Sequence, residues 1–483
     1  MSSPNSCRVS ILSLLVTAVL HVLSTATLPA RAADWTNSGG NASRNCLTSE
    51  LGPTDITTTL WSGGRPSIIA WQPVIEGNRV FMVRELTFPP TSVPNDAYIV
   101  AMDLDTGAEL WAKTLPYNTG EWIPWIAGVK NGRVFASRSG NGGSIAAKLY
   151  ALDVVTGDII WDSDDTTRAG AYDGVVFAPD GDPIIASHLF ITRINAEDGA
   201  TVWNRTRDRA VSGECGGAIF GDALYIDGLA PGGQVIERRD LATGLYMYES
   251  PVMPGFTEQN WPMVGPDGTI YMSRVQNNVA VDFFYAFTDT GSAITQKWSV
   301  PANWSTTSEF GVGPDGSVYM IAPGRMLSRL NPVNGAVIDD VGPIPNDGGN
   351  GLAPRMAIDA AGRVYFSNGQ FGSGRVYCFT PNLDEIWSLA VPNVNVGAPA
   401  IGANGTLVIA GIGNNVRAYR NATTCNPCDA DCSGAVDFND MSPFVNALLG
   451  NPTGCSPCQA DTNGDALANG ADVAGFVACL LGP

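Results

Sequence analysis

Short segments in which apolar and polar residues alternate recur along most of the chain, separated by glycine-containing turns. The clearest is AMDLDTGAELW, Ala101–Trp111, where an alternating segment, a Thr-Gly turn and a second short segment ending in tryptophan follow one another. Variants of this unit end at Trp161 and Trp203. Alternation with a period of two is typical of strands that bury one face. The pattern therefore predicts a mainly β protein built from a repeated strand–turn–strand unit.

A second repeated feature gives the number of units. Hairpins with Asn-Gly, Asp-Gly or related turns, which suit tight β-turns, place an equivalent apolar residue at eight positions, 40 to 54 residues apart. These positions are Val80, Val134, Ile184, Leu224, Ile270, Val318, Val364 and Leu407. Repeats of this length made of short strands indicate a β-propeller with four-stranded blades. We expect an eight-bladed propeller over residues 33–420.

The last of these units, which ends near Tyr419, has no outer strand of its own. Near the N-terminus, Thr57–Trp61 has the closing tryptophan but no unit before it. We expect this N-terminal strand to complete blade eight, because closing the ring removes an open sheet edge.

The Thr-Gly-x-x-x-Trp repeat resembles the quinoprotein (PQQ-type) eight-bladed propellers, a family that contains dehydrogenases and non-catalytic scaffold proteins. The resemblance extends over roughly residues 35–420 and is strongest in the first three blades. It implies that the repeated tryptophans pack between neighbouring blades. These are Trp61, Trp111, Trp161, Trp203, Trp298 and Trp387.

Two aspartate-rich loops follow the repeats, DADCSGAVDFND at 429–440 and DTNGDALANGAD at 461–472. Oxygen-bearing side chains stand at positions 1, 3, 5, 9 and 12, with a backbone carbonyl at position 7, which is the spacing of an EF-hand-like calcium loop. The expected ligands are Asp429, Asp431, Ser433, Ala435, Asp437 and Asp440 in the first loop and Asp461, Asn463, Asp465, Leu467, Asn469 and Asp472 in the second. After Arg420 there is no Lys, Arg or Glu, and all seven aspartates fall on ligand positions. We therefore expect two calcium ions.

An apolar helix is predicted after each loop, MSPFVNALLG and VAGFVACLLG. Two loop–helix units with Asp at position 12 resemble a type I dockerin over residues 429–482. The resemblance implies that residues 421–483 attach the protein to a cohesin-like or other surface protein. Positions 10 and 11 are Phe438-Asn439 and Gly470-Ala471 rather than the usual Ser/Thr pair, so the sequence does not name the partner.

The N-terminus has the pattern of an export signal. Arg8 precedes the mostly apolar Val9–Leu23, and Ala30-Arg31-Ala32 forms a cleavage site. We expect residues 1–32 to be removed and the mature protein to be secreted or held at the cell surface. A membrane span is not expected, because the apolar run is shorter than the roughly 20 residues needed to cross a bilayer.

Net charge excludes one class of partner. The chain carries −19, which becomes −21 when Arg8 and Arg31 leave with the signal. Nucleic-acid binding relies on Lys and Arg against phosphate, so nucleic-acid partners are not expected.

Six of the ten cysteines are concentrated after residue 424. In an exported protein this density favours disulfides, although two Cys-x-x-Cys pairs leave a four-thiolate zinc site as the alternative. Six cysteines allow fifteen connectivities, and the sequence selects none. The cysteines are Cys425, Cys428, Cys432, Cys455, Cys458 and Cys479.

Catalysis has weaker support than binding. The adjacent cysteine pair that the quinoprotein dehydrogenases imply is missing, and His188 is the only histidine outside the signal. No catalytic residue is assigned, and an extracellular enzyme, either PQQ-dependent or acting on polysaccharides, remains the alternative. A level nine residues before the hairpin positions holds candidates for binding a glycan or peptide at the entrance of the ring, unless they plug its channel. These are Trp71, Trp125, Trp261, Glu309 and Arg355.

Overall fold

The fold is taken from a computed structural model of the chain, in which most of residues 34–481 are described. The described residues are 34–63, 72–85, 97–140, 144–169, 174–209, 211, 216–255, 261–274, 282–302, 310–345, 355–368, 374–391, 399–411, 416–421, 427–431, 433, 435–450, 459–463 and 467–481. The predicted signal, 1–32, lies outside them.

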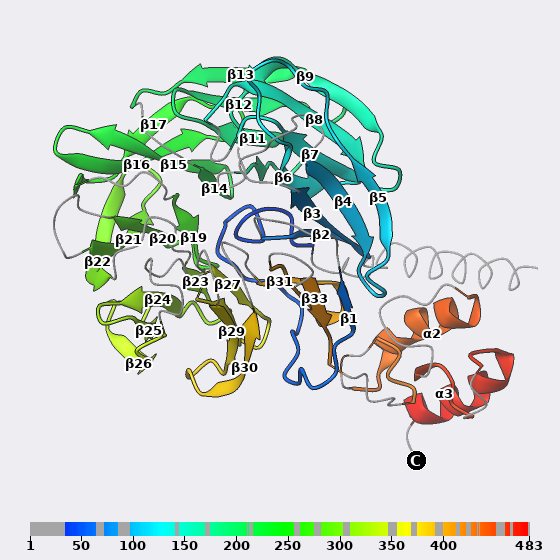
Figure 1. Cartoon of the computed structure of the whole chain (residues 1–483). Coiled ribbons are helices and arrows are strands. Elements are labelled where there is room, and N and C mark those ends of the chain that lie inside the picture. The colour runs from blue at the N-terminus through cyan, green and yellow to red at the C-terminus, as the bar shows by residue number, and fades with distance from the viewer. Residues whose placement is uncertain are drawn as a thin grey trace, which may run out of the picture. The chain divides into compact units, whose positions relative to one another are not determined.

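Eight antiparallel sheets form a ring, which confirms the predicted eight-bladed propeller (Figure 1). The first strand of each blade lies nearest the ring axis. The first four blades are β2 (Val74–Glu76), β3 (Arg79–Glu85), β4 (Ala97–Asp103), β5 (Glu109–Lys113); β6 (Trp125–Lys130), β7 (Arg133–Ser137), β8 (Ala147–Asp153), β9 (Ile159–Thr167); β10 (Val176–Phe177), β11 (Pro183–Ala186), β12 (Phe190–Ile194), β13 (Thr201–Thr206); and β14 (Gly217–Phe220), β15 (Ala223–Ala230), β16 (Gly233–Asp240), β17 (Tyr246–Glu249), with β18 (Met253–Pro254) also paired to β16.

The remaining blades repeat this order, and a 3-10 turn, η2 (Ala403–Gly405), lies within the eighth. They are β19 (Met263–Val264), β20 (Ile270–Arg274), β21 (Asp282–Asp289), β22 (Ile294–Ala302); β23 (Gly311–Val312), β24 (Val318–Ala322), β25 (Met326–Leu330), β26 (Val337–Val341); β27 (Arg355–Ile358), β28 (Val364–Ser367), β29 (Gly374–Phe379), β30 (Glu385–Val391); and β31 (Pro399–Gly402), β32 (Thr406–Ile409), β33 (Val416–Tyr419), β1 (Trp61–Gly63).

The ring closes where the sequence predicts. Strand β1 pairs antiparallel with β33, with Trp61 opposite Ala418, so the N-terminal strand is the outer strand of blade eight. All eight equivalent hairpin residues lie on the second strands of their blades and are at most 1% exposed. The hairpin repeat therefore marks the buried face of each blade.

Several of the repeated tryptophans join one blade to the next, as the family resemblance implies. The indole N–H of Trp111 donates to the main-chain oxygen of Val154 at 3.1 Å, and that of Trp161 to Ala196 at 3.0 Å. Blade four has Tyr248 instead, and its hydroxyl donates to the carboxylate of Asp289 in blade five at 2.6 Å. Blade four thus keeps a contact at this junction without the tryptophan.

The N-terminal segment preceding β1 passes through the centre of the ring (Figure 1). Trp35 is fully buried and forms an antiparallel bridge with Ile75 of β2, and Leu47 forms a parallel bridge with Ile358 of β27. Blades one and seven are therefore both in contact with this one segment.

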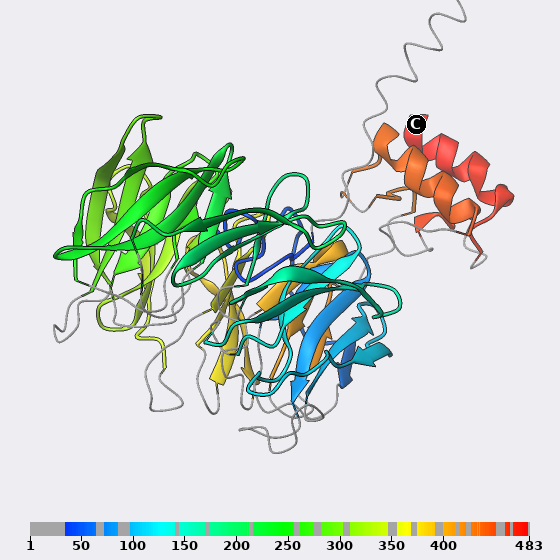
Figure 2. The ribbon, with the colours of Figure 1, turned by 90° about the horizontal axis from the view of Figure 1, so that it is seen from above.

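The C-terminal residues form two helices, each preceded by a 3-10 turn. They are η3 (Phe438–Asp440), α2 (Met441–Leu448), η5 (Gly470–Asp472) and α3 (Val473–Leu481). Figure 2 shows α2 and α3 alongside each other, and the rings of Phe444 and Phe476 stack between them with centroids 3.8 Å apart. In the part of the chain that the structure describes, no helix combines the length and apolar character of a membrane span.

Candidate metal centre

Each predicted calcium loop is closed by the aspartate at its twelfth position. Asp440 is fully buried at the end of η3, and its carboxylate accepts hydrogen bonds from the backbone N–H groups of Asp431 at 2.9 Å and Asp437 at 2.7 Å. One side chain therefore holds the third and ninth residues of the first loop together.

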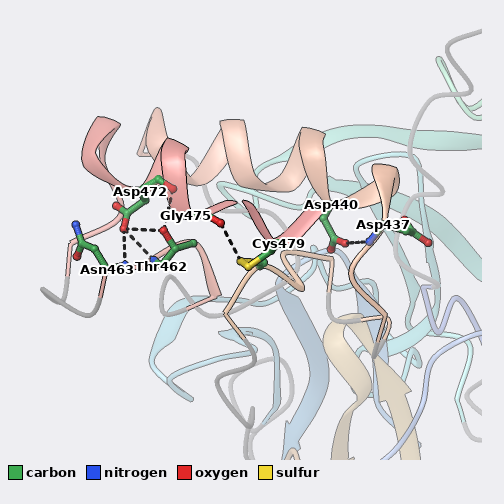
Figure 3. The surroundings of a disulfide bond; sticks show 8 residues. Asp437, Asp440, Thr462, Asn463, Asp472, Gly475 and Cys479 are labelled. Carbon is green, nitrogen blue, oxygen red and sulfur yellow. Dashed lines mark hydrogen bonds between the residues drawn. A yellow bond between two sulfur atoms is a disulfide. The ribbon is translucent and has the colours of Figure 1, made fainter. Parts of the chain in front are cut away.

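The second loop is built in the same way. The buried carboxylate of Asp472 accepts from the backbone N–H groups of Thr462 at 2.8 Å and Asn469 at 2.9 Å, and Asn463 N–H adds a bond at 3.2 Å (Figure 3). Each loop is thus closed by backbone hydrogen bonds to its twelfth residue, which agrees with the equal ligand spacing of the two loops in the sequence.

The ninth residue of each loop starts the turn before the helix. Asp437 accepts from the N–H of Asn439 at 2.7 Å, and Asn469 accepts from the N–H of Ala471 at 2.8 Å. Both form a capping box with the aspartate three residues later. An Asx side chain satisfies an N–H group that has no partner in the first turn. Both helices therefore begin directly after their loops.

A disulfide joins the two ends of this module. Cys428 precedes the first loop, Cys479 lies in α3, and the two are bonded across a sequence separation of 51 residues. Cys428 N–H also donates to the carbonyl of Gln459, next to the second loop, at 2.9 Å. One disulfide of the predicted set is thus confirmed, and it removes Cys428 from the alternative four-thiolate zinc site. The other four cysteines lie outside the described residues.

Three carboxylates of the first loop converge. Asp429, Asp431 and Asp440 each offer an oxygen, and these atoms all lie within 4.8 Å of one another. Asp429 and Asp440 are buried. Burial raises the pKa of the Asp440 carboxyl above its ordinary value, and the charge of Asp431 acts in the same direction against the hydrogen bonds that lower it. Like charges at this separation repel strongly.

The donor set suits a hard cation. All side chains in the cluster are oxygen donors, and the sequence after Arg420 has no Lys or Arg to balance them. Calcium takes six to eight oxygen ligands and favours carboxylates and backbone carbonyls. Carboxylates brought together without a cationic side chain therefore fit a divalent ion in the first loop.

The other predicted ligands are not part of this cluster of three carboxylates. In the first loop Ser433, Ala435 and Asp437 are exposed, and the Ser433 hydroxyl donates to the carbonyl of Ala435 at 3.2 Å. In the second loop Asp461, Asn463, Leu467, Asn469 and Asp472 are described, whereas Asp465 lies outside the described residues. Hydrogen bonds from backbone N–H groups, that of Asn469 first, lower the pKa of Asp472.

The structure describes three of the five propeller residues predicted to bind a ligand. Trp125 is fully buried in β6 and offers no open face. Trp261 lies under the guanidinium of Arg44, 5.1 Å from its ring centroid. Arg355 starts β27, opposite Ser367, and Trp71 and Glu309 lie outside the described residues. A ligand site formed by these five residues stays a prediction, while the sequence analysis missed the buried Arg44.

Comparisons with known proteins concern the propeller. A family model described as outer membrane protein assembly factor BamB matches residues 95–338. No curated protein matches the sequence. Among solved structures, BamB from Moraxella catarrhalis is 15% identical, covering 76% of this chain and 98% of its own, with a TM-score of 0.50.

Two further structures are similar with the same TM-score of 0.50. Quinohemoprotein alcohol dehydrogenase from Comamonas testosteroni is 12% identical and covers 80% of both chains. The computationally designed Ika8 protein is 12% identical and covers 75% of this chain and 99% of its own. At these identities the likeness concerns the fold alone.

Proposed function

The chain belongs to the propeller family described as outer membrane protein assembly factor BamB, and from this premise we propose that it is an exported, non-catalytic binding protein. Its propeller binds a protein partner or another extracytoplasmic ligand. Its C-terminal module, residues 421–483, is dockerin-like and attaches the protein to a complex or surface when calcium is bound.

The convergence of Asp429, Asp431 and Asp440 is the observation that carries the attachment. Calcium bound there would neutralise the crowded carboxylates and fix the loop from which α2 starts. The second loop has the same closure through Asp472. Two ions would therefore set the positions of both helices.

Each helix also presents apolar side chains to solvent. On α2 these are Met441 and Val445, with Leu449 directly after the helix end. On α3 they are Val473, Val477 and Leu481. The spacing of four residues places each set along one helix face. Exposed apolar patches of this kind mark protein-binding surfaces, which supports docking of a cohesin-like partner.

The propeller half of the proposal rests on the family. Its description names an assembly factor, a protein that acts by binding other proteins. The likeness to the alcohol dehydrogenase adds no support for cofactor chemistry, because it is a likeness of fold at 12% identity. An extracellular dehydrogenase or polysaccharide-degrading enzyme with the same module is the alternative.

Calorimetric titration of the full chain with calcium tests the attachment module. We expect two ions per chain, one after Asp429→Asn combined with Asp440→Asn, and one after Asp461→Asn. Asp198→Asn, in a propeller turn, is the matched control and should keep two. Capture of a purified type I cohesin should then require calcium and end with EDTA. A chain that takes up no calcium would contradict the proposal.

A further inference from the structure

Residues 34–51 make hydrogen bonds to every blade of the ring, from blade one near Trp35 to blade eight near Glu50. Main-chain bonds join Trp35 to Ile75 of β2 in both directions, at 2.9 and 2.8 Å. Val129 of β6 donates to the carbonyl of Thr36 at 2.8 Å. The Asn37 side chain donates to the carbonyl of Val175, next to β10, at 2.9 Å. Trp35, Thr36 and Asn37 thus reach blades one, two and three.

Arg44 holds the segment to blade four. Its Nε–H donates to the carbonyl of Gly217 in β14 at 2.8 Å, and Ile219 of the same strand donates to the carbonyl of Ala42 at 2.8 Å. The Arg44 side chain is almost fully buried, and its guanidinium covers the ring of Trp261. A charged side chain buried in this way needs its donors satisfied, and the inner edge of the blade provides the acceptor.

Asn45 and Cys46 continue the sequence through blades five, six and seven. The Asn45 amide donates to the carbonyl of Val264 in β19 at 2.8 Å, and its main-chain oxygen accepts from Val312 of β23 at 3.0 Å. The main-chain oxygen of Cys46 accepts from Ile358 of β27 at 2.7 Å. Two adjacent residues therefore bridge three blades.

Blade eight completes the set. The Glu50 carboxylate accepts from the N–H of Gly405 at 3.3 Å. Gly405 has a positive φ of 65°, and a Cβ there would lie 2.0 Å from the carbonyl oxygen of Leu51. This close approach is possible only for glycine, so the blade is shaped to the segment at this point.

The segment also has a compact shape of its own. Gly40 N–H donates to the carbonyl of Asn37 at 2.9 Å, and Cys46 N–H donates to the carbonyl of Gly39 at 2.9 Å. Gly39 and Gly40 have φ values of 84° and 86°, which glycine adopts without strain. A turn held by its own hydrogen bonds loses less conformational freedom on docking.

We infer that the inner ends of the eight blades form a circular peptide-binding site, and that residues 34–51 are a separable ligand that fills it within the same chain. The inner strands recognise the segment through main-chain hydrogen bonds and through their carbonyl groups, which accept from the side chains of Arg44 and Asn45. Because its last contacts are made by blade eight, the earliest part of the mature chain docks after the final blade has formed. This inference is independent of the calcium module.

Complementation by a free peptide tests the inference on the full chain. Arg44→Ala combined with Asn45→Ala should lower the melting temperature. A synthetic peptide of residues 34–52 should restore it in a saturable, one-to-one manner. The labelled peptide should bind this variant at least tenfold more tightly than the wild-type chain, whose site is already filled.

Two controls keep the result specific. A peptide carrying the same two alanines should not restore the melting temperature, and a chain with Thr58→Ala, at an exposed position of the same N-terminal stretch, should melt like wild type and bind no peptide. If the double variant does not fold, Asn45→Ala alone is tested in the same way. An unchanged melting temperature, or a lowered one that the peptide does not restore, would overturn the inference.

Discussion

The indole N–H of Trp61 donates a 2.7 Å hydrogen bond to the main-chain oxygen of Leu104, across the junction between blades eight and one. Trp203, at the same position in blade three, is equally buried, but its indole nitrogen finds no acceptor among the described residues. The two junctions thus differ in one hydrogen bond.

Trp61→Phe should therefore destabilise the propeller more than Trp203→Phe does. The loss of ring volume is the same in both, so the difference reports the hydrogen bond, about 1 kcal/mol. Urea unfolding of the full chain measures it. Equal losses in the two variants would show that the bond contributes nothing to closing the ring.

A glycine in the repeated turn packs against the tryptophan of the preceding blade. Gly157 has a φ of 72°, and a Cβ there would lie 2.6 Å from the ring of Trp111. Gly157→Ala should combine about 1–2 kcal/mol of left-handed strain with about 1–3 kcal/mol of overpacking. Gly291, at the same turn position in blade five with a φ of 85°, has nothing within 4 Å. Gly291→Ala should show the strain alone, and thermal unfolding should separate the two variants.

The carboxyl of Asp227 makes the stability of the propeller depend on pH. Burial raises its pKa to about 7, although Arg207 lies 3.6 Å away and acts in the opposite direction. Because the folded pKa exceeds the unfolded value, folding takes up a proton between about pH 4 and pH 7. The contribution of the Asp227 carboxyl to the free energy of unfolding is fully present below pH 4 and is lost as the pH rises through 7.

Asp227→Asn should remove that dependence. Relative to the variant, wild type should lose stability from pH 4 to pH 7 by at most about 1.4 kcal/mol per pH unit for the one proton involved, and the difference should level off above pH 7. Unfolding titrations at pH 4.5, 6 and 8 give the slope. Asp240, whose pKa is lowered by hydrogen bonds from Thr243, is the control. Its contribution to stability is present above its unfolded pKa and is lost only at more acid pH, so Asp240→Asn should lower stability by a nearly constant amount at pH 4.5, 6 and 8.

Breaking the Cys428–Cys479 disulfide should loosen the C-terminal module. Without this cross-link, which closes a loop of 51 residues, the free energy of unfolding should fall by about 4 kcal/mol in the chain-entropy account. In Cys428→Ser with Cys479→Ser, hydrogen exchange of residues 441–448 and 473–481 should speed up. Exchange in β24 should stay unchanged. Full protection of both helices in the variant would contradict a stabilising role for the bond.

The periodic features of the blades were predictable from the sequence. The segment that passes through the centre of the ring was not. Val80 and its seven equivalents recur in a hairpin pattern that each blade sets locally, so blade number and closure by β1 followed. Residues 36–46 are mostly small or polar, without alternation, and resemble a linker. Their bonds depend on eight inner strands far away in the chain, such as that of Arg44 to Gly217, and no local pattern encodes such distances.

The C-terminal module shows the same division. The spacing of Asp429, Asp431 and Asp440 predicted a shared centre, because ligand positions within one loop are local. The partner of Cys428 is 51 residues away in α3, and its choice depends on how the two helices pack. Sequence spacing left that pairing open.

The position of β33 in blade eight determines where a pulling force on the C-terminal module acts on the ring. This strand is hydrogen-bonded to β32 on one side and to β1 on the other, and the C-terminal module follows it in the sequence. A pull on that module reaches the ring at Tyr419, where two neighbouring strands resist it. Strand β1 follows residues 34–51, which hydrogen-bond to all eight blades, so we expect tension on β1 to be spread over the whole ring.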